Sequence, residues 1–187
     1  MPRSRVLTHD RIIQSAYALF YRQGFARVSM DAIAPRAGVT KRTLYAHFDS
    51  KDTLLGEVLH HHQELALARI ETWAGSLDRS DPKSIDRLFS DVTLWSSRRR
   101  WSGAGFTRLV MELADLPGHP ARKIARRHKG AVESRLSLAL GSAEVGAEIM
   151  LLLEGTFALL LVHDDRRYAE IGAAAAKKLM RFAMSKS

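Results

Sequence analysis

The segment Val28–Lys51, VSMDAIAPRAGVTKRTLYAHFDSK, decides the fold of this chain. Its pattern predicts a short helix, a tight turn at Gly38-Val39 and a second short helix. The exposed face of that second helix carries polar, basic and aromatic side chains: Thr40, Lys41, Arg42, Thr43, Tyr45 and His47. Two helices joined by a short turn containing glycine form a helix-turn-helix, the motif that places a recognition helix in the major groove of DNA.

Neighbouring positions support this pattern. Ser29 and Thr40 stand immediately before the two short helices, where N-cap residues are expected, and Leu44 is spaced to point inward. A preceding helix is predicted to begin near Thr8, with this threonine as its N-cap, and a long helix is predicted to follow the motif. The three helices around the turn are therefore expected to form a small domain over residues 1–50.

The charge of the chain favours a polyanionic partner. The 187 residues carry a formal net charge of +9, and the pI is about 10.2. Residues 1–55 hold nine Lys and Arg against four Asp and Glu. Such a surplus is typical of nucleic-acid binding, although many basic proteins touch no nucleic acid. Cysteine is absent, which excludes disulfides, thiolate zinc sites and thiol catalysis.

Helical periodicity continues through the rest of the chain and strand signals are lacking, so an all-α fold of about nine helices is predicted. Residues 51–187 are expected to form a second helical domain. Its most apolar run, Ile149–Val162, contains Glu154 and is shorter than the ~20 apolar residues that a membrane span needs. This run predicts a buried or interface helix and no membrane association. The N-terminus lacks the apolar core of a secretory signal, so a cytoplasmic location is expected.

Three segments of the sequence resemble the N-terminal DNA-binding domain of the TetR/AcrR family of bacterial repressors. They are Ala16–Phe25 with its AxxLFxxxGF-like spacing, the stretch VSMDAIAPRAGV, and the signature TKRTLYAHFDSKDTLL. The resemblance covers residues 8–59. It implies a three-helix helix-turn-helix domain followed by a helical domain for effector binding and dimerisation. It also implies a transcriptional regulator, most often a repressor released from double-stranded operator DNA by a small molecule.

The resemblance implies a set of DNA-binding residues: Ser29, Thr40, Lys41, Arg42, Thr43, Tyr45, His47 and Lys51. From the first turn of the recognition helix, Lys41 and Arg42 can donate to guanine, and the methyl group of Thr43 can pack on thymine. His47 is expected to contact a base or the backbone. The alternative for Lys41 and Arg42 is that they are solvated surface charges.

Three further residues of the set are expected to contact phosphates. Ser29 is expected to bind a phosphate at the start of a helix, and Tyr45 and Lys51 are expected to contact the DNA backbone. The alternative for Tyr45 is a place in the core. Arg3 and Arg5 are expected to precede the first helix and to reach the minor groove as an arm, unless this chain end is disordered.

Two residues depart from the family pattern. Arg42 occupies a position that is often glycine in the family, so we expect it to add a base or phosphate contact. Pro35 falls inside the second helix, where a proline costs about 3 kcal/mol if the helix is regular. A kink or a displaced helix start is therefore predicted at Pro35.

The middle helices, about residues 50–140, are expected to enclose the effector pocket that the resemblance implies. The candidate lining residues are aromatic, methionine and histidine side chains: His62, Trp73, Trp95, Phe106, Met111 and His128. Each is also compatible with an ordinary place in the core. Glu64 follows three consecutive histidines, but only His60 and Glu64 share a helical face, so neither a metal site nor a cofactor is predicted.

The last two helices, predicted over about residues 144–163 and 168–185, are expected to form a homodimer interface, as the resemblance implies. The segment 145–162 is apolar nearly all round, and Gly172 with Ala173–Ala176 allows another helix to approach closely. The alternative is that both helices only complete the core of one subunit.

Two other classes of protein are alternatives to a regulator. No Ser-His-Asp constellation, phosphate loop or carboxylate pair emerges, so enzymatic activity is not predicted. An architectural DNA-binding protein without an effector is the other alternative. A regulator gives a sequence-specific footprint that a small molecule relieves, and an architectural protein gives neither.

Overall fold

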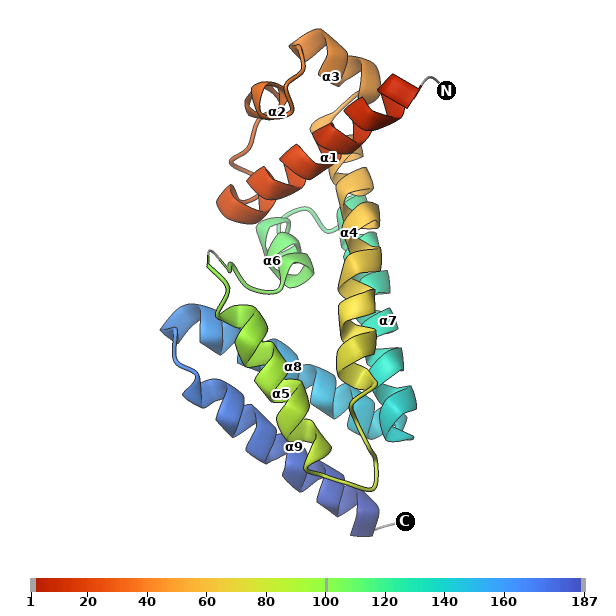
Figure 1. Ribbon diagram of the computed structural model, residues 1–187, viewed down its shortest axis with the longest axis vertical. Helices are drawn as coiled ribbons and strands as arrows, with labels where there is room; N and C mark the ends of the chain where they lie inside the picture. Colours follow the sequence, from red (N-terminus) through yellow and green to blue (C-terminus); the bar gives the residue numbers. More distant parts are fainter. Residues whose placement is uncertain (1–2, 100, 186–187) are drawn as a thin grey trace. The chain divides into compact units, whose positions relative to one another are not determined.

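The computed structural model describes residues 3–99 and 101–185, with side chains described from residue 5 onward (Figure 1). Within these ranges the chain is all α-helical, which confirms the predicted fold class and the number of helices. The nine helices are α1 (Arg3–Gln23), α2 (Met30–Arg36), α3 (Lys41–His47), α4 (Lys51–Ala74), α5 (Ser84–Ser96), α6 (Gly105–Glu112), α7 (Pro120–Leu140), α8 (Ala143–His163) and α9 (Arg167–Ser185).

The chain divides into two compact units. Unit 1 comprises the chain up to Leu65 together with Gly105–Arg126, and unit 2 comprises Ala66–Ala104 together with the chain from Arg127 onward. Helices α4 and α7 therefore each contribute residues to both units. The division groups α6 and the first turns of α7 with the helix-turn-helix, although they lie far from it in the sequence.

The core of unit 1 is built by α1, α2, α3 and the start of α4. Ile12, Ile33, Leu44 and Leu54 are completely buried, one from each of these helices. Phe48, which ends α3, is almost completely buried as well. The inward orientation predicted for Leu44 is confirmed. Because α3 is only two turns long, this burial stabilises a helix that would not form alone in water.

The turn between α2 and α3 depends on Gly38. This residue has a φ of +64°, which strains any residue with a Cβ. The N–H groups of Ala37 and Val39 donate to the carbonyls of Ile33 and Ala34, at 3.0 Å each, and so close the end of α2. The predicted helix-turn-helix geometry is therefore present, with glycine at the position that reverses the chain.

Pro35 lies in the last turn of α2, one residue before its end, and is exposed. Helix α2 begins at Met30, directly after its cap Ser29, so Pro35 is not at the edge of the first turn and the displaced start is not found. The kink at Pro35 stays a prediction. The missing N–H of Pro35 removes one hydrogen bond near the end of a seven-residue helix. The helix stops at Arg36, so few further bonds are lost.

The predicted start of the first helix is corrected. Helix α1 begins at Arg3, so Thr8 is an internal residue and not the N-cap. The residues before Thr8 include neither glycine nor proline within the helix, and extending a helix that has already formed costs little. Helix α5 begins at Ser84 and α6 begins at Gly105.

Helix α6 is fastened to the end of α1 by two polar contacts. Arg108 Nη1 donates to the carbonyl of Tyr21 at 2.9 Å, and the backbone N–H of Ala26 donates to Glu112 Oε2 at 3.2 Å. Arg108 and Glu112 also form an ion pair with each other, with Nε and Oε1 3.3 Å apart. One turn of α6 thus satisfies a carbonyl and an N–H at the end of α1 and in the loop that follows it.

In unit 2, helices α5, α8 and α9 lie side by side (Figure 1). They approach closely at Gly172, where a Cβ would lie 2.5 Å from Phe89 Cε1 and 2.6 Å from Thr156 Oγ1. Helix α8 is long and apolar enough to cross a membrane by length and composition alone. However, 44% of that window is buried inside the structure, and Glu154 forms an ion pair with Lys129 of α7. Helix α8 is thus part of the core of unit 2.

Candidate nucleic-acid interface

The two short helices of the motif are each capped by a side-chain oxygen. Ser29 Oγ accepts from the N–H of Ala32 at 3.2 Å, and Thr40 Oγ1 accepts from the N–H of Thr43 at 3.1 Å. The hydroxyls of Thr40 and Thr43 are 2.8 Å apart and form a further hydrogen bond. Both predicted N-caps are confirmed. Such caps stabilise a helix by about 1 kcal/mol, which matters for helices of seven residues.

The recognition helix α3 has one buried and one exposed face. Leu44 is completely buried, whereas Lys41, Arg42 and Tyr45 are exposed. The exposed fraction of Tyr45 is 41%, which excludes the core position considered above. Two basic side chains and a phenol therefore face solvent from a helix that is anchored by its opposite side. Arg and Lys are the side chains that reach base edges and phosphates from such a helix.

Lys41 is held by a carboxylate of α2. Its Nζ lies 2.8 Å from Asp31 Oδ1 and 3.0 Å from Asp31 Oδ2. The hydrogen bond that Lys41 donates to Asp31, and then the charge of Asp31, raise the pKa of Lys41 above its ordinary value. The ring of Tyr45 lies 6.0 Å from the same ammonium group. The pairing of Asp31 with Lys41 was not predicted from the sequence, because the nine residues between them include the turn that brings them together.

His47, the last residue of α3, is partly buried beside α1. Its ring centroid is 6.0 Å from that of His9, and the His9 ring stacks on Phe48 at 5.1 Å. Burial, followed by the nearby charges of Arg5 and His9, lowers the pKa of His47 below its ordinary value. The imidazole of His47 is therefore neutral at physiological pH and offers one donor and one acceptor.

Lys51 has a structural contact that the sequence did not reveal. Its Nζ donates to the carbonyls of Phe25 and Val28, at 3.1 Å each, and lies 4.3 Å from the centre of the Phe25 ring. Two of its three donors are thereby engaged, which leaves one for a phosphate. Lys51 fastens the start of α4 to the loop between α1 and α2.

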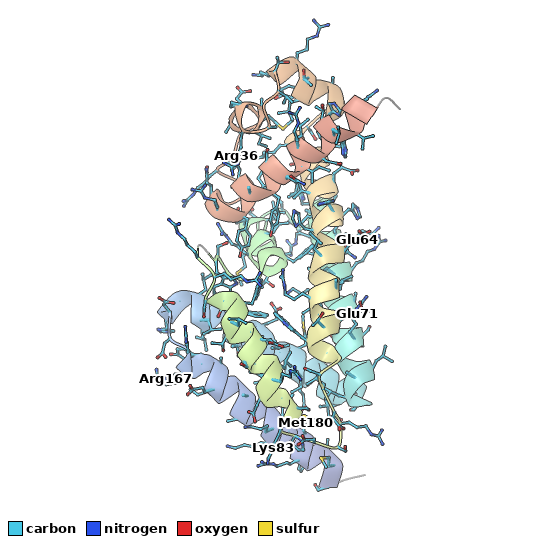
Figure 2. The ribbon with its side chains drawn as sticks, viewed as in Figure 1. Arg36, Glu64, Glu71, Lys83, Arg167 and Met180 are labelled. Carbon is cyan, nitrogen blue, oxygen red and sulfur yellow. The ribbon has the colours of Figure 1, made fainter. Side chains whose placement is uncertain are left out.

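A groove of about 470 Å³ beside the motif is lined by α1 and by the end of α2. Its lining residues are Arg11, Gln14, Ser15, Arg36 and Ala37. Arg36 lies at the end of α2 (Figure 2). Both guanidinium groups add positive charge to unit 1, in agreement with the basic N-terminal composition. Arg5 lies within α1 and not ahead of it, so the arm predicted for this residue is wrong. The side chain of Arg3 lies outside the described residues.

The six predicted pocket residues fall into the two units, three in each. His62, Phe106 and Met111 belong to unit 1. The His62 ring stacks on Tyr17 with their centroids 3.2 Å apart, and burial lowers the pKa of His62 to about 4. Phe106 is buried, but Met111 is 67% exposed, because it lies on the side of α6 away from Phe106 and Leu109. Met111 therefore does not fit an enclosed lining position.

Trp73, Trp95 and His128 belong to unit 2. Trp95 contacts Trp73, Trp101 and Phe157, with ring centroids 5.8, 5.7 and 5.3 Å apart. Trp101 and Phe157 were not predicted from the sequence as neighbours of Trp95, although a third tryptophan close to Trp95 in the sequence was a usable signal.

Unit 2 also contains a cationic group, Arg69, and a buried histidine, His128. The Arg69 guanidinium lies 5.1 Å from the centre of the Trp95 ring, within the range of a cation–π interaction. His128 is 5% exposed. Burial, and then the charge of Lys129, lower its pKa to about 4, so that its imidazole is neutral at physiological pH.

Helices α8 and α9 each leave apolar side chains uncovered. On α8, Leu151 is 74% exposed and Val162 is 72% exposed. They share one face with the exposed Ala147, Gly155, Ala158 and Leu159. On α9, Ile171 and Phe182 are more than half exposed. We call these residues of α8 and α9 the apolar face of unit 2. Exposed apolar faces of this kind mark places where proteins associate.

The fold and the exposed face of α3 define a helix-turn-helix DNA-binding protein. Residues 12–58 match the family described as bacterial regulatory proteins, tetR family. The chain is 40% identical over 62 residues to the HTH-type transcriptional regulator UidR of Escherichia coli, covering 33% of this chain and 32% of UidR. It is 33% identical over 102 residues to the HTH-type transcriptional regulator TtgR of Pseudomonas putida, covering 50% of this chain and 46% of TtgR.

Solved structures share the whole fold. A TetR-family transcriptional regulator from Streptomyces coelicolor superposes with a TM-score of 0.82 at 22% identity, over 94% of this chain and 95% of that one. The reduced form of NemR from Escherichia coli superposes with a TM-score of 0.78 at 19% identity, over 91% of this chain and 96% of NemR. The sequence matches assign residues 12–58 to the TetR family, and the whole chain has the fold of TetR-family transcriptional regulators. Its sequence matches span about a third of UidR and about half of TtgR.

Proposed function

We propose that this chain is a cytoplasmic, homodimeric repressor that binds double-stranded operator DNA and is released by a small-molecule effector. The observation that carries the proposal is the recognition helix α3, which is capped at Thr40, anchored by the buried Leu44 and basic on its exposed face. No enzymatic step, metal or cofactor enters this proposal. The chemistry that it requires is binding alone.

The residues proposed to contact DNA form two groups, one that contacts base edges and one that contacts phosphates. Lys41, Arg42 and Thr43 begin the recognition helix, where side chains reach base edges in the major groove. Thr40, Ser29 and Tyr45 are proposed to contact phosphates, the first two beside helix N-termini whose N–H groups favour an anion.

Two residues of the proposed contact set also serve the fold. His47 is proposed as a neutral contact to a base or the backbone, because burial keeps its pKa low. Lys51 is proposed to offer its remaining donor to a phosphate, while its other two donors hold the carbonyls of Phe25 and Val28.

The apolar face of unit 2 supports homodimerisation through α8 and α9. Leu151 and Val162 lie eleven residues apart on α8 and share one side of the helix with Gly155, where a Cβ would meet no atom within 4 Å. A helix from a second copy can therefore come close at Gly155. The free energy gained by removing apolar area from water is about 25 cal/mol per Å². A symmetric dimer places two recognition helices on half-sites about one DNA turn, ~34 Å, apart.

The effector is proposed to bind among the aromatic side chains of unit 2, with Trp73 and Trp95 as its contacts and His128 as a neutral polar group. Ligand sites are mostly apolar with a few placed polar groups, which suits this set. Trp73 lies on α4, the same helix that begins at Lys51. A ligand that moves Trp73 therefore acts on the helix that enters the DNA-binding unit.

The proposed control requires a ligand that prefers the form unable to bind the operator. Such a ligand lowers operator affinity by the ratio of its own affinities for the two forms, and operator DNA lowers ligand affinity by the same factor. Both half-sites must be in register at once, so a small change in the separation of the recognition helices is sufficient.

Selection of bound fragments from the source genome tests this proposal. The purified protein is mixed with sheared genomic DNA, bound fragments are sequenced, and a recovered site is measured by fluorescence anisotropy against a scrambled duplex. We expect a two-fold symmetric site, a dimer by light scattering, and release by a small molecule connected with the neighbouring genes. A monomer that binds every duplex equally would refute the proposal, and specific binding that no compound relieves would refute its effector part.

A further inference from the structure

The ion pair between Asp31 and Lys41 puts a negative charge on the face that is proposed to meet DNA. Asp31 lies in the first turn of α2, and Lys41 is the first residue of α3. The Lys41 ammonium lies 2.8 and 3.0 Å from the two carboxylate oxygens. The two side chains are 62% and 63% exposed, so DNA phosphates have access to both.

We propose that Asp31 is a specificity-determining residue, which engages Lys41 and thereby weakens binding to DNA of arbitrary sequence. This inference rests on the proposed function, because it takes α3 as the DNA reader. In the free protein the ammonium of Lys41 has a carboxylate partner. To contact a phosphate it must give up that partner, and the carboxylate of Asp31 is then left near the negatively charged backbone.

The cost of separating the pair differs between arbitrary DNA and an operator. Binding to arbitrary DNA consists almost entirely of phosphate contacts, which provide acceptors and no donor. A phosphate can therefore replace Asp31 as the partner of Lys41, but it gives nothing to Asp31. Base edges do provide donors, namely the amino groups of cytosine and adenine, and carboxylates accept from cytosine N4. A suitable base sequence can therefore satisfy both members of the pair.

The stabilising effect of a negative charge near the N-terminus of a helix is the simpler role for Asp31. That role stabilises the folded state and does not involve Lys41. The two roles are distinguished by whether the effect of changing Asp31 on DNA binding depends on Lys41. A double-mutant cycle measures this dependence directly.

The experiment measures binding of full-length Asp31→Asn to a random-sequence duplex, by fluorescence anisotropy, between 50 and 200 mM KCl. Freeing one cation for phosphate contact increases the magnitude of the slope of log K against log salt by about 0.9. We expect this change together with about three- to tenfold tighter binding to the random duplex at 100 mM KCl. Binding to the selected operator is expected to gain less, so the ratio of operator to random affinity falls.

The matched control is Asp49→Asn, which removes the same charge from the same unit. Asp49 is exposed just after α3 and has no ion-pair partner among the described residues. A third comparison introduces Lys41→Met into the wild type and into the Asp31→Asn protein. We expect it to change random-duplex affinity by less than about twofold in the wild type and by more than about threefold in the Asp31→Asn protein.

Equal effects of Asp31→Asn and Asp49→Asn on the random duplex would overturn the inference, because net charge alone then explains them. An equal effect of Lys41→Met in both backgrounds would overturn it as well. Thermal melting checks folding, and Asp31→Ser, which keeps a neutral polar side chain in the first turn of α2, replaces Asp31→Asn if the latter does not fold. The double-mutant cycle uses random DNA, so it gives a result even if no operator is recovered. A failure to recover an operator would count against the proposed function and not against this inference.

Discussion

Replacing Lys51 by methionine tests whether this side chain fastens the DNA-binding unit. The change removes two hydrogen bonds of 3.1 Å to the carbonyls of Phe25 and Val28, and a cation 4.3 Å from the Phe25 ring. A hydrogen bond from a charged donor contributes about 1.5–3 kcal/mol, and a cation–π contact about 0.5–1 kcal/mol. Lys51 is partly exposed and water can replace some of these contacts, so we expect a loss of about 2–3 kcal/mol.

In a chain of 187 residues, about 1 kcal/mol of stability corresponds to about 2–4 °C in Tm. The expected fall in Tm for Lys51→Met is therefore about 5–10 °C, measured by differential scanning calorimetry. Lys123→Met is the control, because Lys123 is an exposed lysine of the same unit. If Lys51→Met melts within about 1 °C of the wild type and only the salt dependence of DNA binding weakens, Lys51 is a phosphate contact and the fastening role is refuted.

The remaining predictions concern the dimer, the reader, a cap and a buried histidine. Leu151→Arg places a charge on the apolar face of unit 2 and is expected to give a monomer by light scattering. The control Leu94→Arg, at a residue of α5 that is 70% exposed, is expected to stay dimeric. If both variants are dimers, the result counts against the α8–α9 interface. Arg42→Ala is expected to lose about 1–3 kcal/mol of discrimination at one operator position without a change in Tm, and unchanged preference at every position would contradict it. Thr40→Ala should lower the free energy of unfolding by about 1 kcal/mol in urea titrations, whereas Thr40→Ser should not. Burial lowers the pKa of His128 to about 4, below its unfolded value of 6.5, so the unfolded chain binds more protons and stability falls as pH decreases from 6.5 toward 4. His128→Gln is expected to reduce this loss by about 1–2 kcal/mol at pH 5, and an unchanged pH profile would show that His128 is accessible to protons in the folded protein.

The sequence predicted the parts of the fold that depend on local patterns. Ser29 and Thr40 are caps because short hydroxyl side chains accept from the N–H two or three residues onward, and this preference is visible in the sequence itself. The burial of Leu44 follows from helical spacing, and the reversal at Gly38 follows from the freedom of glycine at positive φ.

Features that join distant parts of the chain were not predictable in this way. The contacts of Lys51 with two carbonyls 26 and 23 residues earlier depend on the path of the loop after α1. The ion pair of Asp31 with Lys41 depends on the angle between two helices. Met111 has an apolar side chain and was expected inside, yet α6 is only eight residues long and buries one narrow face. Composition does not show which side of so short a helix is covered.

The attachment of α6 to the end of α1 limits how this protein can be divided. A fragment that ended at Leu65, where the first segment of unit 1 ends, would lack α6. The carbonyl of Tyr21 would then lose its donor Arg108, and the N–H of Ala26 would lose its acceptor Glu112. Exchange of sensory halves between related regulators therefore needs Gly105–Arg126 to be transferred together with the N-terminal segment. A chimera joined by a single crossover after α4 would separate residues that bind each other.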